Sequence, residues 1–251
     1  MPLRPFIVLA SLLGLGSPTS GTAGDVHVAV AANFAAPMKI IADEFQKTAD
    51  HRALLSFGAT GKFYAQIING APFDVFLAAD VATPDRLERE GFSVPGSRVT
   101  YAVGRLALWS ANPDFVDDRG AILKRGAFHH IALAAPKLAP YGAAAVETLE
   151  KLDLLDTLRP KFVLGENIAQ AYQFVATGNA DLGFVALSQV YSDGKLKFGS
   201  GWIVPSGFHA PLRQDAVILS RGANNPAAPA LIRFLQSPRV RAILESHGYG
   251  Y

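Results

Sequence analysis

Cysteine is absent from the 251-residue sequence, which excludes disulfides, thiolate metal sites, a cysteine nucleophile and a cysteine-linked lipid anchor. An excess of charge of one sign is absent as well, because 23 Lys and Arg residues are balanced by 21 Asp and Glu residues, giving a formal net charge of +2. So small a charge excludes the strong electrostatic footprint typical of proteins that bind nucleic acid. Half of the residues are hydrophobic, so the chain is predicted to fold into one or two globular domains.

The motifs of common enzymes and cofactor sites are also missing. The six histidines form neither an HExxH pattern nor a pair four residues apart, and no G-x-S-x-G elbow is present. A Gly-Lys pair occurs at Gly61-Lys62, but Ser56 stands where a P-loop needs its first glycine. The sequence therefore predicts no catalytic residue, no protein ligand to a metal and no cofactor. A periplasmic hydrolase or phosphatase remains the alternative from the enzyme class.

A long apolar run is found only at the N-terminus. Arg4 is the one charged residue before Asp25, residues 6–15 are apolar, and small residues precede Ala23. This pattern predicts a signal peptide over residues 1–23, cleaved after Ala23, because the run is too short to span a bilayer. The alternative is a buried N-terminal helix. We expect an exported protein that is free in a periplasm, since no cysteine can carry a lipid.

Short strands and helices alternate along the rest of the chain, in two series. Such β-α-β order predicts mostly parallel sheets with helices on both faces, and the two series predict two lobes. A crossover through strands near 101–107 and 209–216 would place both chain ends in one lobe. The expected strands lie at 25–32, 54–57, 74–79, 101–109, 130–135, 161–164, 181–186 and 214–219. Thr60, Thr83 and Asn167 are expected to cap the helices that begin beside them.

Small and hydroxylic residues recur where predicted strands lead into helices. Asn33 and Thr60 occupy two of these junctions, Pro140-Tyr141-Gly142 the third and Gly165-Glu166-Asn167-Ile168 the fourth. The first N–H groups of a helix have no internal partner, so several helix starts at one sheet edge can hold an anion. Each junction alone is an ordinary cap, and only the recurrence indicates a ligand site. Glu166 would repel an anion, so we expect it to face solvent.

At these junctions the sequence resembles the periplasmic molybdate-binding proteins of ABC import systems, over essentially the whole mature chain. The segments that carry the resemblance are AVAANFAAPMKIIADEF (29–45), SFGATGKFYAQIINGAPFDVFLAAD (56–80), PGSRVTYAVGRLALWS (95–110), LAPYGAAAVETL (138–149), GENIAQAYQFVATGNADLGFVALS (165–188) and SPRVRAILESHGY (237–249). The resemblance implies the type II periplasmic binding-protein fold, with two α/β lobes joined by a two-strand hinge. The implied boundaries are 24–104 and 210–251 for one lobe and 105–209 for the other.

The resemblance also implies the residues that hold the ligand. The side chains of Asn33 and Thr60 and the backbone N–H groups of Tyr141 and Ile168 fall on the family's ligand positions. Many members add a tyrosine hydroxyl, but that position is Ala186 here. The implied function is capture of molybdate, and of tungstate, by a monomer that delivers it to a membrane permease of an ABC transporter.

Two alternatives stay open at this point. A protein of the same class could bind sulfate, phosphate or a small organic acid, and a sensor or adhesion module would have the same composition. Competition against bound molybdate separates the first alternative from the main hypothesis.

Overall fold

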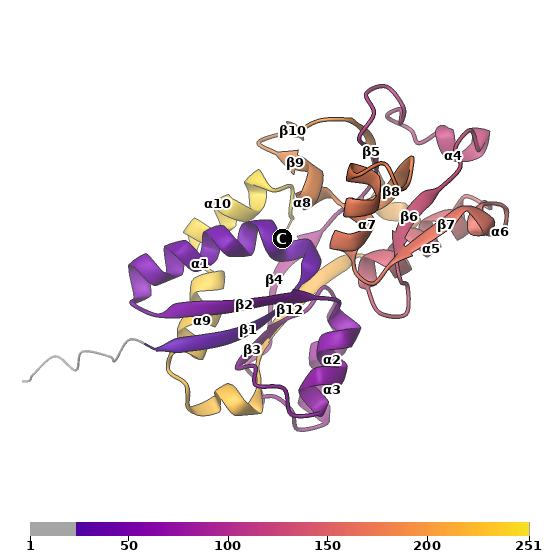
Figure 1. Cartoon of the computed structure of the whole chain (residues 1–251). Coiled ribbons are helices and arrows are strands. Elements are labelled where there is room, and N and C mark those ends of the chain that lie inside the picture. Colours follow the sequence, from indigo (N-terminus) through magenta and orange to yellow (C-terminus); the bar gives the residue numbers. More distant parts are fainter. Residues whose placement is uncertain (1–23, 251) are drawn as a thin grey trace, which may run out of the picture.

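The computed structural model describes residues 24–250, so the predicted signal peptide at residues 1–23 lies outside the described residues. Two five-stranded sheets organise this part of the chain (Figure 1). We call each sheet with its helices a lobe. Both sheets are mixed and flanked by helices, which confirms the predicted two-lobed α/β fold. No helix among residues 24–250 is long and apolar enough to cross a membrane.

Lobe 1 is built from both ends of the described chain. Its sheet has the order β2-β1-β3-β12-β4, with β1 parallel to β2 and β3, and β12 antiparallel to β3 and β4. The strands are β1 (Asp25–Ala31), β2 (Arg52–Gly58), β3 (Val75–Leu77), β4 (Val99–Gly104) and β12 (Leu212–Ile218). The helices are η1 (Ala32–Phe34), α1 (Ala35–Ala49), α2 (Thr60–Ile68), α3 (Ala82–Arg89), η4 (Ser220–Asn224), α9 (Ala227–Leu235) and α10 (Pro238–Ser246).

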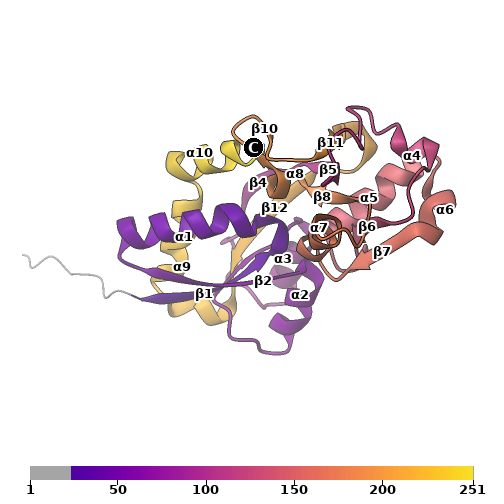
Figure 2. The ribbon, with the colours of Figure 1, turned by 45° about the horizontal axis from the view of Figure 1, so that its top comes forward.

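The helices of lobe 1 cover both faces of its sheet because alternate side chains of β1 point to opposite faces. Val26, Val28 and Val30 pack with the apolar faces of α1, α9 and α10, while Ala29 packs with Phe63 of α2 on the other face. Figure 2 shows α1, α9 and α10 on one side of the sheet and α2 and α3 on the other. The apolar periodicity that predicted these helices therefore marks their buried stripes.

Lobe 2 has the sheet order β11-β5-β8-β6-β7, in which β6 runs parallel to β7 and β8, and β5 runs antiparallel to β8 and β11. The strands are β5 (Leu106–Ser110), β6 (Ile131–Ala134), β7 (Phe162–Gly165), β8 (Leu182–Ala186) and β11 (Ser200–Ile203). A separate two-stranded ladder joins β9 (Tyr191–Ser192) to β10 (Lys195–Leu196). The helices are α4 (Ile122–Arg125), α5 (Pro140–Lys151), α6 (Leu155–Leu158), η2 (Arg159–Lys161), α7 (Ile168–Ala176), α8 (Leu187–Val190) and η3 (Ser206–Phe208).

The chain crosses between the sheets at two places within the described residues. It passes from β4 to β5 at Arg105, and it returns from β11 to β12 through residues 204–211. The single strand predicted over 101–109 is therefore wrong, because its two halves pair in different sheets. The C-terminal segment reinforces this hinge, since the N–H and carbonyl groups of Gly250 and Val103 are joined by two hydrogen bonds of 2.8 Å.

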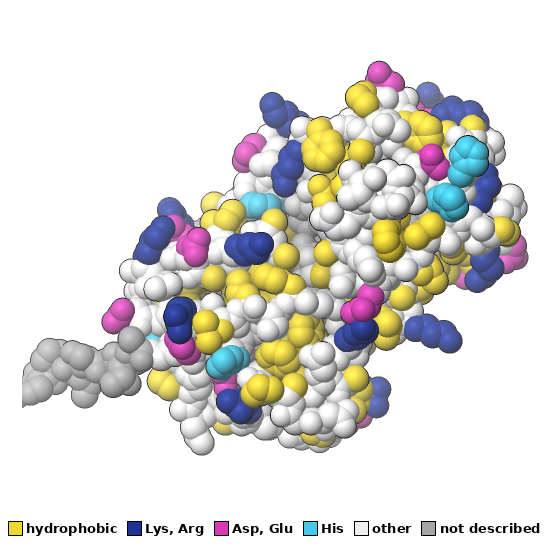
Figure 3. Space-filling view, in the orientation of Figure 1, with side chains coloured by type: hydrophobic (Ala, Val, Ile, Leu, Met, Phe, Trp, Pro, Cys, Tyr) yellow, Lys and Arg dark blue, Asp and Glu magenta, His cyan; other side chains and the backbone are white. Residues whose placement is uncertain are grey.

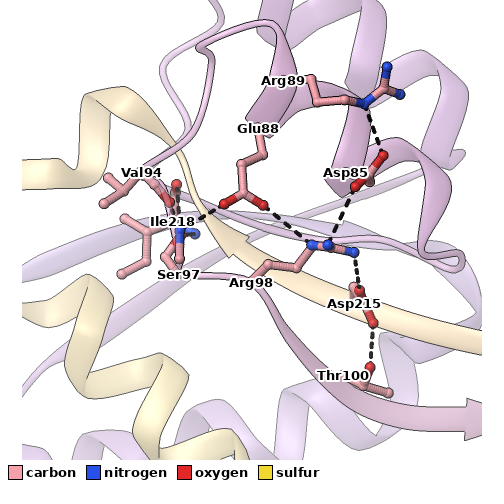
Figure 4. Close-up of polar contacts among 10 residues, drawn as sticks. Asp85, Glu88, Arg89, Val94, Ser97, Arg98, Thr100, Asp215 and Ile218 are labelled. Atoms are coloured by element: carbon pink, nitrogen blue, oxygen red, sulfur yellow. Dashed lines mark hydrogen bonds and ion pairs between the residues drawn. The ribbon is translucent and has the colours of Figure 1, made fainter.

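Charged side chains tie α3 to the strands beside the hinge (Figure 4). Arg98 lies 3.4 Å from Asp85 and from Glu88 and 3.3 Å from Asp215, whose other oxygen accepts a 2.7 Å hydrogen bond from Thr100. Asp215 follows an irregularity in the pairing of β12 with β4, between Gln214 and Asp215. The network therefore holds β12 at the position where its register changes.

Candidate functional site

A small cavity lies between the lobes, where the strands of both sheets lead into helices. The space around it, counted together with the part open to solvent, is about 200 Å³. It is lined by Ala31, Ala32, Asn33, Gly58, Ala59, Thr60, Ala79, Ala139, Pro140, Tyr141, Asn167 and Ile168. All four candidate ligand positions, Asn33, Thr60, Tyr141 and Ile168, thus reach one cavity although they lie far apart in the sequence. Contact with a ligand stays a prediction for each of them.

The helix starts around the cavity leave selected N–H groups without a partner. At α7 the predicted cap is confirmed: Asn167 Oδ1 accepts hydrogen bonds from the N–H groups of Ala169 and Gln170. Ile168 N–H is left over at that helix start. At α5 the carbonyl of Ala139 accepts from residues 142 and 143, which leaves the N–H of Tyr141. Among the described residues, neither Ile168 N–H nor Tyr141 N–H has a hydrogen-bond partner. Both are free to donate to an anion at positive helix ends.

Thr60 does not act as the predicted cap, because it is the first residue of α2 and the capping position is Ala59. Its Oγ1 instead accepts a 3.1 Å hydrogen bond from the N–H of Ala79, across two strand ends. A hydroxyl that accepts through a lone pair keeps its proton. Thr60 is 2% exposed, so this proton is held at the cavity wall with no acceptor of its own among the described residues.

The side chain of Asn33 is engaged differently from what the sequence suggested. Its Nδ2 donates to Gln214 Oε1 at 2.9 Å and to the hydroxyl of Tyr249 at 3.0 Å. The two amide hydrogens therefore point into a buried polar cluster instead of the cavity. The backbone N–H of Asn33 has no partner among the described residues, so this residue also presents a free donor at the cavity wall.

The Tyr141 side chain enters the same cluster from lobe 2. Its hydroxyl accepts from Gln214 Nε2 at 3.2 Å and fits against Gly104, where an added Cβ would lie 2.0 Å from the hydroxyl oxygen. Glycine at position 104 thus lets lobe 2 insert an aromatic side chain between the hinge strands. Burial raises the pKa of Tyr141 well above its usual value, so the ring stays neutral.

Charge is kept out of the cavity and gathers at its rim. No Lys or Arg lines the cavity, and no cluster of His, Asp or Glu among residues 24–250 could hold a metal ion. Lys62 of α2 forms a 2.6 Å ion pair with Glu166 of lobe 2, and both side chains are about half exposed. The prediction that Glu166 faces solvent is confirmed, since it is exposed, and its ion-pair partner Lys62 comes from the other lobe. Figure 3 shows basic and acidic side chains interspersed over this face of the molecule.

Direct bonds between the lobes show that the cleft is closed. The N–H of Gly61 donates to the carbonyl of Leu138 at 2.9 Å, and Ser188 Oγ donates to the carbonyl of Asn33 at 2.8 Å. The hydroxyl of Tyr249 lies 3.1 Å from Ser188 Oγ. These bonds join the two lobes directly beside the cavity.

Sequence reasoning missed Gln214, Tyr249, Ser188 and Gly104. The sequence carried no signal for Gln214, because it stands between Arg213 and Asp215 in β12, and only the structure shows that it is fully buried. A buried amide has to find hydrogen-bond partners, so such a residue indicates a polar cluster in the core.

The comparisons with known proteins agree with this geometry. A family model described as bacterial extracellular solute-binding protein matches residues 26–250. The chain belongs to this family. The chain is 61% identical over 228 residues to the molybdate-binding protein ModA of Azotobacter vinelandii, and the match covers 91% of this chain and 90% of the relative. It is 51% identical over 241 residues to ModA of Rhodobacter capsulatus, covering 96% and 93%.

A solved structure supports the same assignment of this solute-binding protein. The periplasmic molybdate-binding protein of Azotobacter vinelandii matches with a TM-score of 0.87 and 40% identity, over 90% of this chain and 99% of that chain. The resemblance read from the sequence segments is therefore confirmed, and so is the fold that it implied.

Proposed function

We propose that this protein captures molybdate in a periplasm and delivers it to the membrane permease of an ABC importer. The observation that carries the proposal is a cavity between two closed lobes, lined by unpartnered N–H groups and free of charged side chains. The names of the relatives supply the anion, because two of them at 61% and 51% identity are molybdate-binding proteins. Tungstate has the same tetrahedral shape and is proposed as a second ligand. The protein acts as a monomer and is not an enzyme.

In the proposed site, Thr60 donates through its hydroxyl and Asn33, Tyr141 and Ile168 donate through backbone N–H groups. Hydrogen bonds to a charged group contribute roughly 1.5–3 kcal/mol each, so these four donors contribute roughly 6–12 kcal/mol, and micromolar binding needs about −8 kcal/mol. Neutral donors and helix ends can therefore hold a dianion without a buried cation. Because no lysine or arginine is left unpaired in the cavity when the anion leaves, release to the permease stays easy.

The donor set also favours one kind of oxyanion. A fully deprotonated tetrahedral oxide accepts hydrogen bonds at every oxygen, whereas a protonated phosphate carries a hydroxyl that needs an acceptor. Sulfate is smaller, so a ring of donors spaced for molybdate would reach it poorly. Binding of sulfate or phosphate is therefore the alternative to be tested by competition.

Isothermal titration calorimetry of residues 24–251 with molybdate tests the proposal. We expect saturable binding at one site and a rise in melting temperature, since a ligand that binds only the folded state stabilises it. Tungstate should compete, and sulfate and phosphate should not. No heat and no thermal shift at micromolar molybdate would overturn the proposal, and tighter binding of sulfate or phosphate would favour the alternative.

A further inference from the structure

Behind the anion cavity lies a buried cluster of polar side chains that join the two lobes. Its members are Asn33, Tyr101, Tyr141, Gln214 and Tyr249, and none is more than 6% exposed. Gln214, on the hinge strand β12, contacts three of the others, yet it does not line the cavity. Its orientation therefore decides which way its neighbours can donate.

In this hydrogen-bond arrangement the donated protons of the cluster do not match the available acceptors one to one. The oxygen Oε1 of Gln214 lies 2.9 Å from Asn33 Nδ2 and 3.0 Å from the hydroxyl of Tyr101. Tyr101 has a single proton and also faces the carbonyl of Ala78 at 2.9 Å, so it can serve only one of the two acceptors. Gln214 Nε2 carries two hydrogens but has one partner, the Tyr141 hydroxyl. One buried amide hydrogen is left without an acceptor.

The same arrangement leaves free only the end of the Asn33 amide that cannot donate to an anion. Since Nδ2 gives both hydrogens to the cluster, Oδ1 is the end of the amide without a partner among the described residues. An amide oxygen carries partial negative charge and can only accept hydrogen bonds. At the wall of an anion cavity it would repel the ligand.

A half-turn of both amides produces a second arrangement in which every proton inside the cluster has a partner, including that of Tyr249, which donates to Asn33 Oδ1 across their 3.0 Å contact. The oxygen and nitrogen of a carboxamide are nearly equal in size, so the turn needs no other movement. Gln214 Nε2 then donates to Asn33 Oδ1 and to the Tyr101 hydroxyl, and Tyr101 donates to Ala78. The Tyr141 hydroxyl donates to Gln214 Oε1, and the Nδ2 hydrogens of Asn33 face the cavity.

The two amides have to turn together. If Asn33 turned alone, its Oδ1 would face Gln214 Oε1 across the 2.9 Å contact, and two acceptors without a proton between them repel. If Gln214 turned alone, two NH₂ groups would meet at the same distance. Each mixed state is therefore costly in a fully buried site.

We propose that Gln214 is a positioning residue for anion binding. In the loaded protein its amide nitrogen faces Asn33 and Tyr101, and this fixes the Asn33 NH₂ group as a donor to the anion. The anion supplies the acceptor that the second arrangement lacks at the cavity, and thereby selects it. This inference rests on the proposed function, because it needs an oxyanion in the cavity.

The variant Gln214→Glu tests this role by its dependence on pH. An ionised carboxylate can only accept, so it holds the Asn33 NH₂ group inside the cluster. We expect the affinity for molybdate to fall about tenfold or more at about pH 8.5. A buried glutamic acid has a raised pKa because desolvation disfavours its charged form, and the carboxylate of the next residue, Asp215, is paired with Arg98. At about pH 6 the protonated carboxyl can donate to Asn33 Oδ1, and affinity should recover toward that of the wild type.

Two further variants separate positioning from packing. Gln214→Met has a similar shape but no donor or acceptor, so its affinity should be reduced by the same factor at both pH values. Gln236→Glu adds the same charge to an exposed residue and should bind as the wild type does. Equal affinities of Gln214→Glu and wild type at about pH 8.5, or a loss that does not recover at low pH, would overturn the inference.

Neutron diffraction from deuterated crystals of the wild type with molybdate gives an answer even where Gln214→Glu does not fold. Deuterons of Gln214 between it and Asn33 would support the inference, and deuterons of Asn33 in that place would refute it. If the wild type binds no molybdate, the proposed function fails as well. If the wild type binds and Gln214→Glu binds equally, only the role of Gln214 fails.

Discussion

Replacement of the Thr60 hydroxyl is the sharpest test of how the cavity holds an anion. Thr60→Val keeps the shape of the side chain but removes a group with two roles: it accepts from Ala79 N–H at 3.1 Å, and its proton is free at the cavity wall. The buried Ala79 N–H then loses its acceptor, which lowers the free energy of unfolding by about 1–3 kcal/mol. That loss affects the empty and the loaded protein alike, so it cancels in the dissociation constant.

The loss of the donated proton acts on the loaded protein alone. A hydrogen bond to a charged group is worth about 1.5–3 kcal/mol, so the dissociation constant for molybdate should rise by about 10- to 150-fold. Calorimetric titration measures this rise, and urea unfolding of the empty protein measures the stability separately. Thr60→Ser, which keeps the hydroxyl, is the matched control and should restore most of the affinity. Binding by Thr60→Val within about twofold of wild type, together with reduced stability, would show that the hydroxyl serves only Ala79.

Three other perturbations test closure and the buried cluster. In Gly104→Ala the new Cβ would lie 2.0 Å from the Tyr141 hydroxyl oxygen, so the ring must leave the hinge, and the affinity for molybdate should fall about tenfold or more. X-ray scattering with saturating molybdate should then show a more open molecule than the wild type, and an unchanged radius of gyration would contradict this. In Lys62→Met the half-exposed ion pair with Glu166 is lost, so molybdate should dissociate at most about fivefold faster than from the wild type at low salt and equally fast at high salt. Stopped-flow measurement of the dissociation rate tests this, and a difference that persists at high salt would mean that the ion pair is not the cause. Burial raises the pKa of Tyr249 from 10.0 to about 12, so the folded state disfavours the phenolate, and the stability that this contributes below pH 10 should be lost as pH rises from 10 to about 12. Urea unfolding across this range should show a smaller loss of unfolding free energy for Tyr249→Phe than for the wild type, and an equal loss in both would refute the assignment.

Local sequence patterns were sufficient to predict most elements and their order. Apolar residues at helical spacing indicated α1, and alternation indicated β1, because both periods follow from backbone geometry alone. The cap at Asn167 was predictable for the same reason, since its side chain bonds to N–H groups two and three residues ahead. The prediction that Thr83 caps a helix was wrong. The helix begins at Ala82, and Asp80 accepts from both the N–H and the hydroxyl of Thr83.

The candidate cavity was predictable as a set of helix starts but not as a set of atoms. Strand ends of parallel sheets meet at one edge, so the junctions at Asn33, Thr60, Tyr141 and Ile168 were expected to converge. Which of their donors are free depends on partners elsewhere, such as the N–H of Ala79 that engages Thr60.

By itself the sequence determined the two α/β series, the small and hydroxylic residues at the junctions and the resemblance to solute-binding proteins, because each is written in neighbouring residues. Tertiary structure alone decided that strand pairing breaks at Arg105 and that Gln214 and Tyr249 reach Asn33. These contacts join residues 181 and 216 positions apart, and no local propensity encodes them. The direction in which a buried amide donates is set by all the protons around it, so it exists only once the lobes have closed.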